Sequence, residues 1–269
     1  MSSDLWEVYA LKYSERNGRT RADSFIFDDD HASPHAMDYF IWVLRSGDQT
    51  ILVDTGYDEN EAVARGRPIL RKPQAALGAL GLRPEAIDRL IITHLHYDHA
   101  GSLQDFPNAR FYLQPAEMAF ATGPCMCESV LKMPYTADHI CQVVQALYSG
   151  RVVFTDVETE VAPGVSVHQI GGHARGLQAV RVKTQSGWMV LASDATHYYE
   201  NFLKRKPFPI VVDLEAMMCG FDTIKTLATS TELVVPGHDP LVTELFAPEG
   251  NSGFVWRLDK GLVKPFPAF

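Results

Sequence analysis

The stretch Leu90–Gly101, LIITHLHYDHAG, places three histidines and an aspartate within positions 94 to 99, directly after an apolar run typical of a β-strand. His94 and His96 lie two positions apart, so on extended backbone their imidazoles point to the same side. Asp98 and His99 follow in a turn that Ala100 and Gly101 allow to bend sharply. Zinc selects imidazole and carboxylate ligands, so this density predicts a metal site rather than a surface loop with scattered histidines.

Three more candidate ligands follow strand-like runs elsewhere in the chain. They are His173 in IGGHARG, Asp194 in VLASDAT and His238 in LVVPGHD. Functional side chains gather where strand ends converge, so we expect these three to join the first cluster. The remaining candidates, His31, His35, His139 and His168, lie in a loop, a helix or a strand without such a setting, and we expect them to be structural.

Length and composition predict one enzyme-like domain over residues 1–269. The chain is 46% hydrophobic and 21% charged, which is ordinary for a globular enzyme. A net charge of −9 disfavours a nucleic-acid partner, and Lys204–Lys206, the one visible basic cluster, fits a solvated loop. There is no signal-peptide pattern and no apolar run of about 20 residues, so we expect no membrane partner. Cys125, Cys127, Cys141 and Cys219 form no C-x-x-C framework and are interpreted as buried or incidental thiols, which fits a cytoplasmic location.

Strand and helix patterns alternate, which predicts an α/β protein. The predicted strands cover residues 6–13, 39–45, 50–56, 89–93, 109–114, 165–170, 178–184, 188–193 and 232–237, and the predicted helices cover 73–80, 115–121, 137–147 and 214–229. Residues 14–38 form the longest stretch without clear periodicity. A long loop in a compact domain is usually functional, so this one is expected to be a lid or a dimer contact. The protein itself is expected to be a monomer or a homodimer.

These motifs, taken in order, resemble the metallo-β-lactamase superfamily. The matching elements are VDTG at Val53–Gly56, H-x-H-x-D-H at 94–99, G-x-H at 171–173, Asp194 after a strand, and P-G-H at 236–238. The resemblance spans Asp54 to His238 and implies a four-layer αββα sandwich with two divalent metal ions at one edge. It implies that one ion is held by His94, His96 and His173, and the other by Asp98, His99 and His238. Asp194 would bridge both, and Asp54 would orient a ligand imidazole.

The ligand types narrow the choice within that superfamily. His96 stands where the flavodiiron branch has glutamate, and Asp194 where secreted β-lactamases have cysteine. Only 31 residues follow His238 (269 − 238), too few for the helical extension of glyoxalase II. The remaining pattern is similar to that of acyl-homoserine lactonases and relatives such as pyridoxolactonase. Zinc is the expected metal, with iron, manganese or cobalt as alternatives.

The resemblance implies that a hydroxide bridging the two ions opens a small lactone, an acyl-homoserine lactone or a relative, to a hydroxy acid. Asp98 would relay the proton to the leaving alkoxide. One position departs from the lactonase pattern, because His197 stands where those enzymes have a substrate-contacting tyrosine. His197 and Tyr198 are both candidates for the hydrogen bond to the developing oxyanion.

Alternative functions are hydrolysis of a thioester, phosphodiester or amide, or a non-catalytic metal sensor. Pocket walls are expected from residues 14–38, 120–135 and 198–209, whose aromatic, Met and Pro content favours an apolar or aromatic substrate portion.

Overall fold

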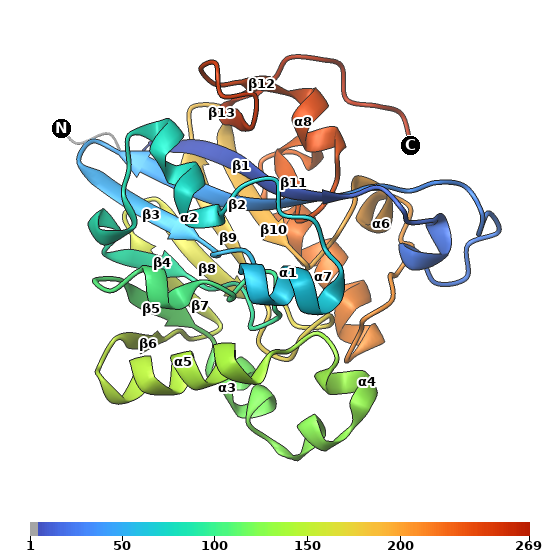
Figure 1. The fold of residues 1–269 in the computed structure, drawn as a ribbon. Helices are drawn as coiled ribbons and strands as arrows, with labels where there is room; N and C mark the ends of the chain where they lie inside the picture. Colours follow the sequence, from blue (N-terminus) through green and yellow to red (C-terminus); the bar gives the residue numbers. More distant parts are fainter. Residues whose placement is uncertain (1–4) are drawn as a thin grey trace.

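Two β-sheets pack face to face in the computed structural model, which describes residues 5–269 (Figure 1). Within that range the larger sheet has eight strands, in the order β12 (Phe246–Pro248), β13 (Val255–Leu262), β1 (Glu7–Arg16), β2 (Met37–Ser46), β3 (Gln49–Val53), β4 (Arg89–Ile91), β5 (Arg110–Leu113) and β6 (Val152–Phe154). The smaller sheet has five, in the order β11 (Val234–Pro236), β10 (Gly187–Ser193), β9 (Gln178–Thr184), β8 (Val165–Gln169) and β7 (Glu158–Ala162).

Strand β2 shows why the larger sheet is covered on both faces. Its residues from Met37 to Leu44 are all buried, which is typical of a strand between two packed layers. Side chains alternate along a strand, so Phe40 and Trp42 face the smaller sheet while Tyr39 and Ile41 face the outer helices. The two faces of one strand therefore contribute to two separate hydrophobic cores.

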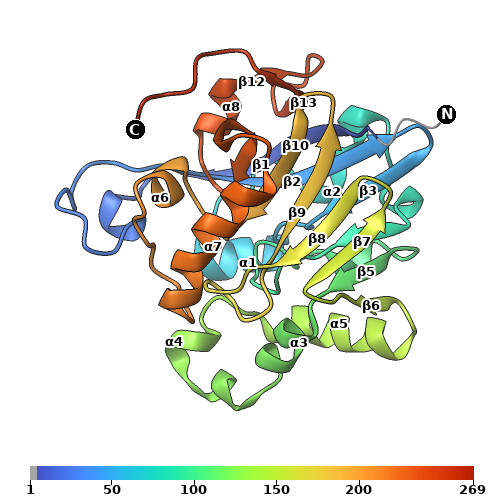
Figure 2. The ribbon, with the colours of Figure 1, turned by 180° about the vertical axis from the view of Figure 1, so that it is seen from behind.

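Helices cover the outer face of each sheet. The larger sheet is covered by α1 (Glu59–Arg65), α2 (Pro73–Ala76) and α5 (Ala137–Tyr148), and the smaller by α7 (Leu214–Leu227), with α8 (Leu241–Leu245) beside it (Figures 1 and 2). Three shorter helices, α3 (Pro115–Ala121), α4 (Ser129–Lys132) and α6 (Tyr199–Leu203), lie in the connections. This arrangement confirms the expected four-layer αββα sandwich.

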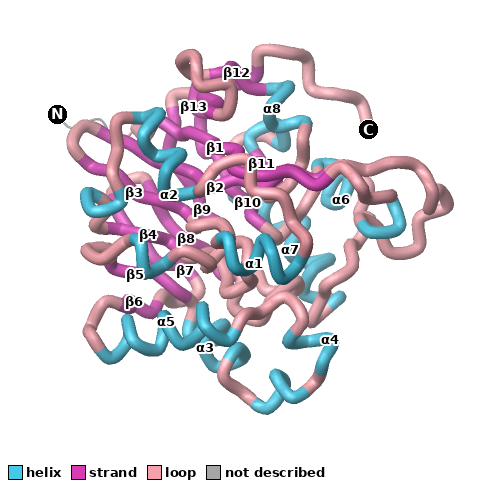
Figure 3. Tube along the Cα trace, in the orientation of Figure 1, coloured by secondary structure: helices cyan, strands magenta, loops and turns pink. Residues whose placement is uncertain are grey.

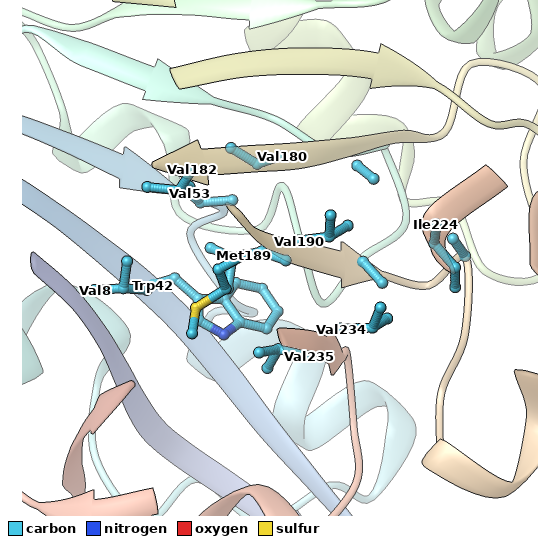
Figure 4. Packing of buried hydrophobic residues seen from close by; sticks show 14 of the residues in the cluster. Val8, Trp42, Val53, Val180, Val182, Met189, Val190, Ile224, Val234 and Val235 are labelled. Carbon is cyan, nitrogen blue, oxygen red and sulfur yellow. The ribbon is translucent and has the colours of Figure 1, made fainter. Parts of the chain in front are cut away.

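The core between the sheets is built from aliphatic residues of both. Val8, Trp42 and Val53 of the larger sheet belong to the same buried cluster as Val180 and Met189 of the smaller one (Figure 4). Each of these side chains is almost completely removed from water. Burial of one such side chain contributes about 1.5–3 kcal/mol, so this interface stabilises the sandwich that supports the site.

Most elements expected from the sequence are confirmed, with ends shifted by a few residues. The expected helix at 73–80 is α2 continued by a 3-10 turn at Leu77–Leu80. Strands β6, β7, β12 and β13 and helices α1, α4, α6 and α8 had not been anticipated. Several of these elements are only three to five residues long, too short to show a periodic pattern.

Residues 17–36 connect β1 to β2 and lie beside α6 (Figures 1 and 3). Arg21 pairs with Glu200 of α6 at 2.8 Å, and the Ile26 amide donates to the Pro207 carbonyl at 2.8 Å. The side chain of Phe25 is buried on the side of this segment that faces α6, whereas that of Phe27 is 91% exposed. The role of the 14–38 loop as a lid or a dimer contact stays a prediction.

Two further expectations concern the surface of the molecule. The four cysteines are free, but three are exposed and Cys125 is half-buried, so the interpretation as buried thiols is wrong and the incidental one remains. None of the helices within residues 5–269 combines the length and apolar character needed to cross a bilayer.

Candidate metal centre

Four strand ends bring the candidate ligands to one edge of the sandwich. Asp54 follows β3, the 94–99 cluster follows β4, Asp194 follows β10 and His238 lies two residues beyond β11. Strands β3 and β4 are parallel, as are β10 and β11, so their carboxyl ends lie at the same side of each sheet. Asp54 and Ser193 have positive φ angles of 61° and 47°. Such strained backbone clusters at functional sites, where the surrounding structure enforces it.

Two glycines allow the loops to approach one another this closely. A Cβ atom on Gly237 would lie 2.6 Å from Oδ1 of Asp194. A Cβ atom on Gly176 would lie 2.3 Å from the Glu117 backbone nitrogen. Gly176, in the IGGHARG segment, therefore lets the loop of His173 lie directly against the backbone at Glu117.

The seven candidate ligands form two adjacent groups. One nitrogen from each of His94, His96 and His173 lies within 4.8 Å of the other two. One ligand atom from each of Asp98, His99 and His238 makes a second group within the same distance. All these side chains are at least nine-tenths buried. The structure thus brings together all the residues that the sequence assigned to the two sites.

Asp194 lies between the two groups and directs one carboxylate oxygen to each. Its Oδ2 is 3.2 Å from Nε2 of His173 and 3.9 Å from Nε2 of His94. Its Oδ1 is 3.0 Å from Nε2 of His238 and 3.3 Å from Nε2 of His99. This is the arrangement required of a carboxylate that bridges two cations.

The other ring nitrogen of three of these histidines is already engaged. Nδ1 of His99 contacts Oδ2 of Asp54 at 2.7 Å, Nδ1 of His173 contacts the Ile210 carbonyl at 2.6 Å, and Nδ1 of His238 contacts the Asp38 carbonyl at 2.8 Å. In a neutral imidazole that donates from Nδ1, Nε2 carries the lone pair. These hydrogen bonds therefore orient three Nε2 atoms as metal ligands. For His99 the partner is Asp54, which was expected to orient a ligand imidazole in this way.

Burial favours the neutral form at the other two histidines. Burial, together with the neighbouring imidazoles, lowers the pKa of His94 and His96 well below the ordinary value. Both rings are therefore uncharged at neutral pH and present a lone pair rather than a proton.

Several buried ligand atoms form no hydrogen bond within residues 5–269. They are Nε2 of His94, His96, His99 and His173, and Oδ1 of Asp194. A buried polar atom without a hydrogen bond costs about 1–3 kcal/mol. Two divalent cations would satisfy these atoms at once, so the residues fit the metal centre that the sequence predicts.

Glu117 is a part of the site that sequence reasoning missed. This fully buried side chain accepts hydrogen bonds from the Leu95 amide at 3.0 Å, the Gly176 amide at 2.8 Å and the Tyr135 hydroxyl at 2.9 Å. Burial raises its pKa, and the hydrogen bonds act in the opposite direction. Glu117 therefore ties the loop that carries His94 and His96 to the loop that carries His173.

The structure separates the two candidates for the oxyanion contact. Nε2 of His197 lies 2.9 Å from Oδ2 of Asp194, and the ring stacks on Phe208 with centroids 3.8 Å apart. Burial lowers the pKa of His197 to about 3, so the neutral ring uses its one proton on Asp194. Tyr198 lies under the 17–36 segment instead, where its hydroxyl donates to the Ala36 carbonyl at 3.1 Å. His197 thus lies against the candidate ligand Asp194, whereas Tyr198 lies away from the cluster.

A cavity opens beside the cluster and is lined by Asp98, Asp194, His197 and His238. The three segments expected to form its walls all contribute, through Met37, Met133 and Pro209 among others. An adjoining apolar cavity shares His96 and His173 with it and is lined by Val130, Leu131 and Ile210.

The remaining histidines at 31, 35, 139 and 168 take no part in any metal-type cluster among residues 5–269.

Comparison with known proteins identifies the family. The model of the metallo-beta-lactamase superfamily matches residues 37–238. An N-acyl homoserine lactonase from Bacillus cereus is 28% identical over 214 residues, which cover 74% of this chain and 80% of that protein.

Solved structures share the same fold. An N-acyl homoserine lactone hydrolase with the product N-hexanoyl-L-homoserine at its catalytic metal centre superposes with a TM-score of 0.74 and 22% identity, covering 91% of this chain and 96% of that one. AidC, described as a dizinc quorum-quenching lactonase, has a TM-score of 0.68 and 16% identity over 98% of each chain. This chain therefore belongs to the metallo-β-lactamase superfamily and is a hydrolase related to the N-acyl homoserine lactonases.

Proposed function

We propose that this protein is a dinuclear metal-dependent hydrolase that opens a lactone ring to give a hydroxy acid. The observation that carries the proposal is the position of Asp194, whose two oxygens face two separate ligand groups. His94, His96 and His173 would hold one cation, and Asp98, His99 and His238 the other. The nitrogen-rich donor set and the dizinc relative favour zinc.

Two cations held here would supply a water of lowered pKa, from about 15.7 towards 7, and polarise a carbonyl oxygen. Asp98 borders the cavity and is positioned to accept a proton on its carboxylate and pass it to the ring oxygen as the acyl–oxygen bond breaks. The apolar walls of the adjoining cavity fit an apolar portion of the substrate.

His197 is proposed to position Asp194 rather than to donate to the substrate. The His197→Phe variant keeps an aromatic ring against Phe208 but removes the 2.9 Å hydrogen bond. Loss of such a hydrogen bond to a metal ligand typically lowers metal affinity about 10- to 100-fold. Competition with a coloured chelator measures that affinity, and His197→Gln, which keeps a donor, should recover part of it. Unchanged affinity in the His197→Phe variant would contradict this positioning role.

The reaction itself is tested by a substrate screen. Metal-loaded protein would be offered γ-lactones of differing side chain, thioesters, amides and bis-p-nitrophenyl phosphate, with metal content measured on the same sample. The proposal expects kcat/KM for one of the lactones to exceed that for every other substrate class. Faster hydrolysis of a thioester or phosphodiester would assign the same site to another reaction, and inertness to all would support a metal sensor.

A further inference from the structure

Arginines surround the mouth of the cavity beside the proposed metal centre. Arg16, Arg19, Arg65 and Arg67 all line it, together with Asp23 and the candidate ligands Asp98 and Asp194. The protein as a whole has a net charge of −9, so this gathering of positive charge is local. The four arginines differ in the partners that they already have within the protein.

Arg19 is a buried cation that forms no ion pair with a carboxylate of residues 5–269. It is only 8% exposed, and its guanidinium donates to the Asp23 carbonyl at 2.7 Å and to uncharged side-chain atoms of Ser24 and Met37. Its Nε has no hydrogen-bond partner among residues 5–269. A buried charge is usually paired, because its desolvation is otherwise costly. Because Arg19 also lines the cavity, an anion bound there would lie beside this unpaired charge.

Two more arginines of the cavity are also without an ion pair. Arg67 is half-buried, lies near Tyr97 and Asp98, and forms no ion pair within residues 5–269. Arg16 is half-buried and forms no hydrogen bond or ion pair through its side chain with any residue of 5–269. Arg65 differs, because its guanidinium pairs with Glu61 and donates to the Met133 carbonyl. Its charge is already compensated within the protein.

The acidic residues of the cavity do not balance these three arginines. Asp98 and Asp194 belong to the proposed metal centre, where the two cations would take up their negative charge. Asp23 is exposed, and its carboxylate accepts from the Thr20 amide at 2.9 Å. With the two cations bound, Arg16, Arg19 and Arg67 would leave this cavity with an excess of positive charge, and such a cavity attracts anions.

We propose that the substrate carries an ionised oxyanion group, a carboxylate or a phosphate, in addition to the bond that is hydrolysed. Arg16, Arg19 and Arg67 bind this group while the reacting carbonyl lies at the Asp194 cluster. The planar guanidinium fork suits both kinds of oxyanion. This inference deepens the proposed lactonase function and rests on it. It also separates this protein's substrate from N-acyl homoserine lactones, which are uncharged.

Matched pairs of lactones test the proposal. One pair is γ-butyrolactone γ-carboxylate and its carboxamide, and a second is γ-hydroxymethyl-γ-butyrolactone and its phosphate ester. We expect kcat/KM for at least one anionic member to exceed that of its neutral partner about tenfold or more, mainly through KM. The pair that shows the larger ratio identifies the oxyanion. Ratios near one for both pairs in the wild-type enzyme would overturn the proposal.

Variants assign the effect to the arginines. In Arg67→Gln and Arg16→Gln, both at partly exposed positions, the ratio of anionic to neutral kcat/KM should fall about tenfold. Arg19→Gln should do the same if it folds, as judged by circular dichroism. The control is Arg205→Gln, an exposed arginine paired with Asp222, for which the ratio should not change. An unchanged ratio in both Arg67→Gln and Arg16→Gln would refute the assignment.

A binding measurement keeps the inference separate from the lactonase proposal. Calorimetry of the metal-loaded protein would compare α-hydroxyglutarate, the ring-opened carboxylate product, with γ-hydroxyvalerate, which has a methyl group in place of the second carboxylate. About tenfold tighter binding of α-hydroxyglutarate, lost in Arg67→Gln, is expected even if no lactone is hydrolysed. If the screen fails but this preference holds, the reaction is wrong and the anion site stands. A parallel measurement would compare the ring-opened form of γ-hydroxymethyl-γ-butyrolactone with and without its phosphate group. Equal affinities within both pairs of compounds would overturn the anion site itself.

Discussion

The Asp194→Ala variant should lose at least about 10³-fold in kcat/KM and bind fewer than two metal ions. Asp194 lies between the two ligand groups, at 3.2 Å from His173 and 3.0 Å from His238. Its removal deprives each site of an oxygen ligand and leaves imidazoles facing each other without a shared anion. Metal-ion stabilisation of a transition state is worth several kcal/mol, and each 1.36 kcal/mol is about tenfold in rate.

Steady-state hydrolysis and elemental analysis of the same preparation measure both effects. The matched control is Asp222→Ala, which removes an exposed carboxylate that pairs with Arg205 and Lys225 on the surface. That variant should keep two ions and wild-type activity. An Asp194→Ala protein with two tightly bound ions and full activity would refute the bridging role.

The Glu117→Ala variant should lower the free energy of unfolding by about 3 kcal/mol or more. It leaves the Leu95 and Gly176 amides and the Tyr135 hydroxyl without their buried acceptor. Each such unsatisfied group costs about 1–3 kcal/mol. Because the loops of His96 and His173 lose their connection, metal affinity should fall as well.

Urea unfolding of metal-free and metal-loaded protein separates the two consequences. Glu215→Ala is the control, since Glu215 also lies in the first turn of a helix but is exposed. Glu117→Gln keeps one acceptor oxygen and should lie between wild type and Glu117→Ala. A Glu117→Ala protein as stable as the control would show that the three hydrogen bonds contribute nothing net.

Local patterns explain why most of the metal centre was predictable from sequence. His94, His96, Asp98 and His99 lie within six positions, so their spacing alone indicates a shared site. Asp194 and His238 were found because each follows an apolar strand, and the structure brings those strand ends together. The αββα sandwich followed from a resemblance carried by the same motifs.

The missed residues have partners that are distant in sequence. Glu117 bonds to Leu95 and Gly176, which are 22 and 59 positions away, and in sequence it looks like any acidic residue in the first turn of a helix. Arg19 and Arg67 are separated by β2 and β3 and resemble ordinary surface arginines until the cavity is seen. Short elements such as β6 and β12, of three residues each, depend on neighbouring strands rather than on their own pattern.

Metal titration of the apoprotein addresses the central claim most directly. Protein stripped by a chelator would be reconstituted stepwise with zinc, while bound metal and lactone hydrolysis are followed together. The dinuclear centre built on Asp194 predicts saturation at two equivalents per chain, with full activity only after the second is bound. A native preparation without stoichiometric metal, whose hydrolysis survives chelation unchanged, would contradict it.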